Sequence, residues 1–160
     1  AEMCAGTARL SQMADVITPN LTEAALLLDC PYKELFGGKP DFHGIVSRLS
    51  MEGKRSVVLT GVSERPGRTG AMCFDAKTGR SEAVQTEFIA HPFHGTGDVF
   101  ASVLTGALVK GKPLAEAAMQ AAEFVRDCAR RTAKEQLPIR EGVDFEPLLS
   151  LLMEGAAGHE

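Results

Sequence analysis

The chain has 160 residues, of which 44% are hydrophobic and 24% charged, and its formal net charge at pH 7 is −4. This length and composition predict one soluble globular domain over residues 1–160, or part of one. The acidic balance argues against a nucleic-acid-binding protein, because such binding depends on basic residues that neutralise phosphates. No apolar run is long enough to span a membrane, and residues 1–10 lack the pattern of a secretory signal, so we expect a cytoplasmic protein.

The four cysteines lie far apart in the sequence and form no CxxC pair. Neither a disulfide framework nor a zinc site follows from such spacing. We expect buried free thiols at all of them, which are Cys4, Cys30, Cys73 and Cys128.

The first half of the chain alternates short apolar runs with helical patterns. Residues 2–13 have modest helical character, and residues 15–18 are apolar and β-branched and end at Pro19, which predicts a buried strand. Asn20 and Glu23 have the N-cap and N3 spacing of a capping box and are followed by strong helix formers. A strand that leads directly into a helix is therefore predicted here.

A second helix and a second strand follow after a predicted loop. Residues 30–40 contain two prolines and two glycines, which favours a loop, and Asp41 then caps a helix that ends before Gly53. The apolar run at residues 56–62 predicts another buried strand. The order strand, helices, strand predicts a parallel pair with a right-handed crossover.

The carboxyl ends of these two strands should meet at one rim, where sheets of this type bind ligands. Residues 18–20 would lie at the end of the first strand, with Thr60 and Gly61 at the end of the second. A capping box alone explains Asn20 and Glu23, and a ligand role is the alternative. For Thr60, a place at the rim and a plain role as a strand former both stay open.

An antiparallel hairpin precedes the second half of the chain. Residues 70–75 and 81–89 read as its strands, joined by a turn, and residues 90–94 as a loop whose histidines carry no assigned chemistry. Residues 96–110 predict an amphipathic helix, and Pro113 opens a long helix whose small residues favour close packing on it.

The end of the chain predicts one more helix. It follows a loop that contains Pro138 and is capped by Asp144. Residues 155–160 should fray. The apolar residues expected on the inner face of this last helix are Phe145, Leu148, Leu149 and Leu152.

Gly95, Thr96, Gly97 and Asp98 carry the strongest functional signal of the sequence. Because neither glycine has a Cβ, an anion can approach the first-turn N–H groups at the positive end of the helix dipole. A carboxylate beside such a cradle repels phosphate, but it can accept a proton from an attacking hydroxyl. The alternative is that Asp98 only complements the helix dipole.

Three segments of the chain together resemble pyridoxal kinases of the ribokinase-like superfamily. The stretch ITPNLTEA at residues 17–24 matches the TPNxxEA segment of that family, residues 95–98 match its GTGD signature, and Thr60 after a Val-Val-Leu strand matches a third feature. The resemblance runs from about residue 15 to residue 152 with the motifs in family order. It implies an α/β fold, the ribokinase-like three-layer sandwich, with a mostly parallel sheet, one antiparallel hairpin and flanking helices.

The activity implied by this resemblance is ATP-dependent phosphorylation of the 5′-hydroxymethyl group of pyridoxal, pyridoxine or pyridoxamine, as in vitamin B6 salvage. Asp98 would be the catalytic base, and the N–H groups of Gly95, Thr96 and Gly97 would form the anion hole. Related hydroxymethylpyrimidine kinases often carry Cys where Asp98 stands, and sugar kinases usually read GAGD, so a pyridoxal substrate is preferred. Another ribokinase-like kinase and a non-catalytic nucleotide-binding fragment are the alternatives.

The resemblance also assigns residues to the nucleotide. Asn20 and Glu23 would act around Mg²⁺ and the phosphates, with Glu23 acting through a water, and Thr60, with Gly61 behind it, would contact the triphosphate. ATP, Mg²⁺ and a B6 vitamer are the implied ligands, and the full-length enzyme is expected to be a homodimer. Kinases of this family are longer and carry their vitamin-binding residues upstream, so we expect a C-terminal, nucleotide-side portion that is not a competent kinase by itself.

Overall fold

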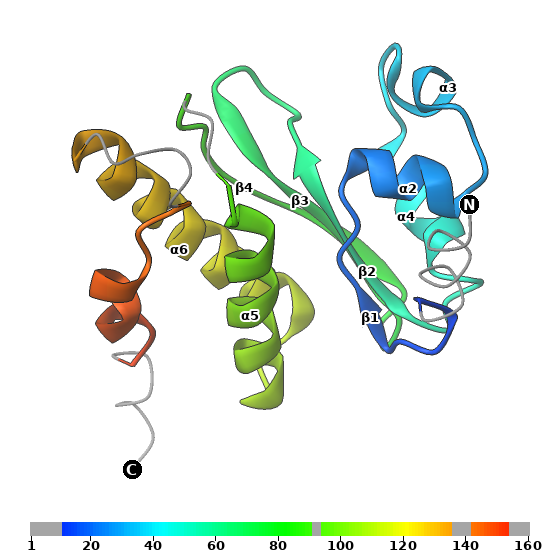
Figure 1. Ribbon diagram of the computed structural model, residues 1–160. Helices are drawn as coiled ribbons and strands as arrows, with labels where there is room; N and C mark the ends of the chain where they lie inside the picture. Colours follow the sequence, from blue (N-terminus) through cyan, green and yellow to red (C-terminus); the bar gives the residue numbers. More distant parts are fainter. Residues whose placement is uncertain (1–10, 91–93, 136–141, 154–160) are drawn as a thin grey trace. The chain divides into compact units, whose positions relative to one another are not determined.

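The computed structural model describes residues 11–90, 94–135 and 142–153, shown in colour in Figure 1. The chain divides into two compact units, one up to Gln85 and one from Thr86 onward. The predicted helical character of residues 2–13, the loop around Pro138 and the fraying of residues 155–160 lie wholly or mostly outside the described residues. No helix in the described part of the chain is both long and apolar enough to cross a membrane.

Four strands form one sheet, which confirms the expected α/β fold. The strand order is β1-β2-β3-β4, and β1 pairs with β2 in parallel, with Val16 opposite Ser56. β2 and β3 are antiparallel, and β3 and β4 are consecutive strands joined by a tight turn, a connection that only antiparallel neighbours allow. The described sheet is therefore mixed, and the prediction of mostly parallel strands is wrong for it. The strands are β1 (Val16–Ile17), β2 (Ser56–Val62), β3 (Arg68–Asp75) and β4 (Arg80–Glu87).

Two glycines shape the pairing of β2, β3 and β4. Thr60 pairs with Ala71 and Val62 pairs with Gly70, so Gly61 is an extra residue in β2, and its φ of 77° is one that glycine adopts without strain. At Gly70, an ideal Cβ would lie 1.9 Å from the carbonyl oxygen of Val84. This close approach of β3 to β4 requires a residue without a side chain.

Three helices belong to the first unit: α2 (Leu21–Leu27), α3 (Tyr32–Phe36) and α4 (Phe42–Leu49). The predicted caps of α2 and α4 are confirmed, since Asn20 and Asp41 each accept a hydrogen bond from the third residue of the helix that follows. The prediction of a plain loop over residues 30–40 is wrong, because α3 lies within it. Pro31 precedes α3, at a position where the missing N–H of proline costs no hydrogen bond. The aromatic rings at the first and last positions of α3, Tyr32 and Phe36, have centroids 5.0 Å apart.

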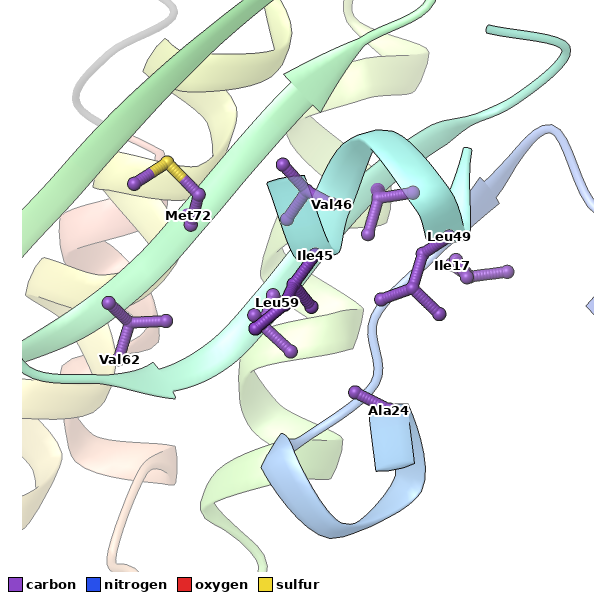
Figure 2. Packing of buried hydrophobic residues seen from close by; sticks show 9 residues of the cluster. Ile17, Ala24, Ile45, Val46, Leu49, Leu59, Val62 and Met72 are labelled. Carbon is purple, nitrogen blue, oxygen red and sulfur yellow. The ribbon is translucent and has the colours of Figure 1, made fainter. Parts of the chain in front are cut away.

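The core of the first unit lies where α4 and α2 pack on β1, β2 and β3 (Figure 2). Figure 2 shows side chains of α4 directed toward those of the sheet. Each fully buried aliphatic side chain contributes about 1.5–3 kcal/mol relative to an exposed one, so the predicted apolar face of α4 is what holds that helix on the sheet. The buried cluster consists of Ile17, Ala24, Ile45, Val46, Leu49, Val57, Leu59, Val62 and Met72.

The second unit is built around a pair of packed helices, α5 (Thr96–Val109) and α6 (Leu114–Glu135), which lie side by side in Figure 1. Gly111, with a φ of 84°, lies in the short turn between them. Three alanines of α6 are fully buried, which confirms the predicted close packing of small residues against α5. They are Ala117, Ala118 and Ala121.

The last element differs from the prediction. Residues 146–152 form the 3₁₀ helix η2 (Glu146–Leu152), whose N-cap is Phe145 without a side-chain hydrogen bond. Asp144 does not cap it, because its carboxylate is paired with Arg131 of α6 at 2.8 Å. None of the apolar residues of η2 is buried, and Leu149 is 45% exposed, so the predicted inner face is also wrong.

The cysteines of the described chain are free, as predicted. Cys73 and Cys128 are buried, whereas Cys30 is only half-buried. Cys4 lies outside the described residues. The expectation of a buried thiol is therefore confirmed at two of the three positions that the structure describes.

Candidate functional site

The carboxyl ends of β1 and β2 meet, as the strand order predicted. The N–H of Thr60 donates to the carbonyl oxygen of Pro19 at 2.9 Å, and Asn20 and Thr60 form an isolated parallel bridge. The Thr60 hydroxyl also donates to the Pro19 carbonyl, at 3.4 Å. Gly61 follows at once in the bulge. These contacts bring Asn20, Thr60 and Gly61 together at one rim of the first unit.

The capping box at the start of α2 is complete. The N–H of Glu23 donates to Oδ1 of Asn20 at 2.9 Å, and the N–H of Asn20 donates to Oε2 of Glu23 at 2.9 Å. Both residues are exposed. A carboxylate has about four lone-pair positions, and this bond occupies one of them. Capping is thus confirmed, and it leaves the exposed oxygens able to meet a second partner.

The donor set at this rim fits one mode of binding for Mg²⁺. No group of three or more His, Cys, Asp or Glu side chains within the described ranges could hold a metal ion by protein ligands alone. Mg²⁺ usually keeps several waters and is held by one or two carboxylates together with substrate phosphates. The exposed carboxylate of Glu23 beside the amide of Asn20 fits that mode and does not fit a closed protein cage.

The second group of predicted site residues, 95–98, lies in the glycine turn, which we define as residues 94–98. Gly95 is the N-cap of α5 with a φ of 79°, and no side chain caps the helix. The first helical bond runs from Val99 N–H to Gly95 O at 3.1 Å, so the N–H groups of Gly95, Thr96, Gly97 and Asp98 have no partner within the helix. An ideal Cβ on either glycine would meet no atom within 4 Å. These amides have no acceptor within the helix, and neither glycine carries a side chain that could block an approaching anion, so we call them the open amides.

Asp98 lies in the first turn of α5 and is exposed. Its backbone carbonyl accepts a hydrogen bond from the Ser102 hydroxyl at 2.8 Å. Its neighbours in the sequence, Thr96 and Gly97, carry two of the amides that have no partner within the helix. An accessible carboxylate next to such amides can accept a proton beside a bound anion.

Asp98 also borders a cavity of about 390 Å³ between α5, α6 and η2. Apolar side chains dominate its walls, among them Val103 and Phe124. Oε1 of Gln120, which lines the cavity, is buried without a hydrogen-bond partner among the described residues. This cavity was not predicted from the sequence, because it depends on how η2 lies against the helix pair.

A backbone contact behind the glycine turn was also not predicted from the sequence. The carbonyl oxygen of His94 accepts a hydrogen bond from the N–H of Val143 at 3.2 Å. From the sequence, His94 had no assigned role, and Asp144 was expected only as a helix cap. No local pattern marks a hydrogen bond between two backbone groups so far apart in the chain.

Residues 2–143 match the family model described as phosphomethylpyrimidine kinase. The hydroxymethylpyrimidine/phosphomethylpyrimidine kinase of Staphylococcus aureus strain MRSA252 is 31% identical over 120 residues, which are 72% of this chain and 41% of that protein. The pyridoxine kinase of Bacillus subtilis strain 168 is 29% identical over 137 residues, 84% of this chain and 47% of that protein.

Solved structures of a phosphomethylpyrimidine kinase and of a pyridoxal kinase are also similar to this chain. A putative phosphomethylpyrimidine kinase from Bacteroides thetaiotaomicron, crystallised with pyridoxal, has a TM-score of 0.84 and 34% identity over 94% of this chain and 53% of its own. An ADP complex of pyridoxal kinase from Bacillus subtilis has a TM-score of 0.65 and 28% identity over 79% of this chain and 47% of its own.

The chain thus spans about half the length, or less, of the relatives that it matches. The family model nevertheless covers both groups of predicted site residues, because its match runs from residue 2 to residue 143. Relatives with hydroxymethylpyrimidine and with pyridoxine in their names lie at similar identity. On this evidence the chain belongs to the phosphomethylpyrimidine kinase family, a group of ribokinase-like kinases.

Proposed function

We propose that this chain, as one domain over residues 1–160, is the C-terminal, nucleotide-side part of an ATP-dependent kinase. That kinase would phosphorylate the 5′-hydroxymethyl group of a B6 vitamer. The observation that carries the proposal is the position of Asp98 beside the open amides of Gly95, Thr96 and Gly97. Phosphoryl transfer asks a protein mainly for positioning and for stabilisation of charge. This arrangement supplies a base and a set of oriented donors in one helical turn.

In the proposed reaction, Asp98 accepts the proton of the substrate hydroxyl while the hydroxyl oxygen forms a bond to the γ-phosphorus of ATP. The bond between that phosphorus and the bridging oxygen breaks, and ADP leaves with its electron pair. The amides of Gly95, Thr96 and Gly97 donate to the oxygens of the transferring group. They do so without reorganisation, because α5 already holds them at its N-terminus.

The rim of the first unit is proposed to serve the nucleotide. Glu23 and Asn20 would hold a magnesium ion that accompanies the triphosphate, with Glu23 acting through a water, and Thr60 would donate its hydroxyl to a phosphate oxygen. When bound, the ion neutralises phosphate charge. Gly61 supports this role because it is exposed and has no side chain that could cover the backbone beside Thr60. Crystallised relatives with ADP support ATP as the phosphoryl donor.

A B6 vitamer is the preferred acceptor, because family members with pyrimidine substrates often carry Cys in place of Asp98, and because a similar structure was crystallised with pyridoxal. Hydroxymethylpyrimidine is the second candidate, supported by the identity to the Staphylococcus aureus kinase. Both acceptors are flat heteroaromatic rings with a hydroxymethyl group. The catalytic roles proposed above are the same for either.

The deciding experiment is turnover of wild type and Asp98→Asn in the full-length enzyme, with ATP, Mg²⁺ and each acceptor in turn. We expect Asp98→Asn to lower kcat by roughly two to four orders of magnitude and to leave the Kd for Mg·ATP within about twofold, because a general base acts in the transition state. Glu116→Gln, in the first turn of α6, is the matched control and should keep full turnover. Near-normal turnover of Asp98→Asn would contradict the assignment, and turnover with hydroxymethylpyrimidine alone would favour the second candidate.

A further inference from the structure

The glycine turn lacks the side chain that usually fixes the start of a helix. Helix N-termini are usually fixed by a Ser, Thr, Asp or Asn side chain that bonds the amides of the first turn. Here the N-cap is Gly95, with no side-chain cap, and it lies in the left-handed region. A capping side chain would occupy the amides that an anion needs, so amides kept open for a ligand require support from elsewhere in the fold.

That support reaches the turn from the segment after α6. The carbonyl oxygen of His94 accepts from the N–H of Val143, which is buried, at 3.2 Å. Gly142 has a φ of 76°, and an ideal Cβ on it would lie 3.2 Å from the same His94 oxygen. The two backbones therefore lie in direct contact immediately before Gly95.

The same segment is tied to α6 through a buried hydroxyl. The N–H of Asp144 donates to Oγ1 of Thr132 at 2.9 Å, and that hydroxyl donates to the carbonyl oxygen of Cys128 at 2.8 Å. Thr132 is only 2% exposed, so loss of the hydroxyl would leave Asp144 N–H without its partner. The Asp144 carboxylate, in turn, accepts from Nε of Arg131 at 2.8 Å and raises the pKa of that guanidinium.

We infer that Thr132 is a positioning residue for the anion hole: through Asp144 and Val143 it braces the His94 carbonyl, and so fixes the open amides of Gly95, Thr96 and Gly97. The ion pair between Arg131 and Asp144 adds little, since Arg131 is 36% exposed and solvent screens exposed ion pairs. The buried hydroxyl carries the connection. This inference rests on the proposed function in one respect, since it takes phosphoryl transfer as the reaction that these amides serve.

The first test is made on the free chain and needs no activity. Amide hydrogen exchange and ¹⁵N–¹H spectra would be recorded for wild type, Thr132→Val, Thr132→Ser and the control Thr105→Val, whose hydroxyl bonds Ala101 O on the exposed side of α5. We expect the Val143 amide to exchange about tenfold faster in Thr132→Val, with shifted signals at residues 94–98, as loss of one hydrogen bond predicts. Thr132→Ser should restore wild-type behaviour, and Thr105→Val should retain it.

A second pair of variants tests the same contact without a substitution in the buried core. Gly142→Ala places a Cβ against the His94 carbonyl, whereas Gly111→Ala introduces equal backbone strain at a φ of 84° with no atom within 4 Å. We expect only Gly142→Ala to shift the signals of residues 94–98. Unchanged signals in both Thr132→Val and Gly142→Ala, or equal changes in their controls, would overturn the inference.

Turnover measurements distinguish a failure of this inference from a failure of the proposed function. In the full-length enzyme, Thr132→Val should lower kcat about tenfold or more while KM for Mg·ATP stays within about twofold, and Thr132→Ser should recover turnover, because misplaced donors weaken the transition state more than the ground state. A wild-type enzyme without turnover would refute the proposed function, and the spectra would still decide whether Thr132 positions the turn. Full turnover of Thr132→Val would overturn the inference itself.

Discussion

Glu23→Gln separates the capping role of Glu23 from its proposed role at the nucleotide. Glutamine keeps an oxygen that can accept the bond now made from Asn20 N–H to Oε2 at 2.9 Å, so the capping box survives. The change removes a negative charge near the N-terminus of α2, where an exposed carboxylate contributes about 0.3–1 kcal/mol through the helix dipole. We therefore expect the free energy of unfolding to fall by no more than about 1 kcal/mol.

The effect on nucleotide binding should be much larger. If Glu23 holds the magnesium ion of Mg·ATP through a water, its replacement removes a charge-assisted hydrogen bond of about 1.5–3 kcal/mol. The Kd for Mg·ATP should then rise roughly ten- to a hundredfold. Calorimetry with Mg·ATP and urea unfolding of the same samples would measure the two effects independently.

Asp41→Asn is the matched control for this experiment. Asp41 is exposed and caps α4 through a bond from Gly44 N–H at 3.0 Å, so the substitution also removes one charge from a capped helix N-terminus. It should cost a similar amount of stability and leave Mg·ATP binding unchanged. If Glu23→Gln binds Mg·ATP as tightly as Asp41→Asn and wild type do, Glu23 serves only as a cap and the proposed nucleotide role is wrong.

Two further predictions concern packing and cysteine chemistry. Gly70→Ala should lower the free energy of unfolding by at least about 2 kcal/mol, because its Cβ would lie 1.9 Å from the Val84 carbonyl, whereas Gly38→Ala, with nothing within 4 Å, should change it by less than about 0.5 kcal/mol. Urea unfolding measures both, and a Gly70→Ala chain of wild-type stability would refute the close strand approach. Burial raises the pKa of Cys73 to about 12 and that of Cys128 to about 11. At pH 8 both thiols should therefore react with iodoacetamide more than about tenfold slower in the folded chain than in the urea-unfolded chain. Peptide mass mapping would measure the two rates. Equal rates in the two states would contradict their burial.

Local patterns predicted the elements that depend on neighbouring residues. The caps at Asn20 and Asp41 involve groups three residues apart, so the sequence contains all of their chemistry, and the structure places both as expected. The helix α3 was missed because five residues are too few to show an apolar period and its flanks are rich in proline and glycine. At the chain's end, apolar spacing does not distinguish a short 3₁₀ helix from an α-helix, and the partner of Asp144 lies in another element.

By itself, the sequence determined the candidate site in outline: the cap of Asn20 and Glu23, the meeting of Thr60 with the end of β1, and a helix that starts at the glycines before Asp98. Strand order and helix periodicity suffice for these features, because parallel strands bring their carboxyl ends to one edge. Only the tertiary structure decided the antiparallel pairing of β2 with β3 and the contact of Val143 with His94. Both depend on backbone hydrogen bonds between distant segments. Every residue type can accept such a bond and every type except proline can donate one, so the amino-acid sequence carries no local mark of them.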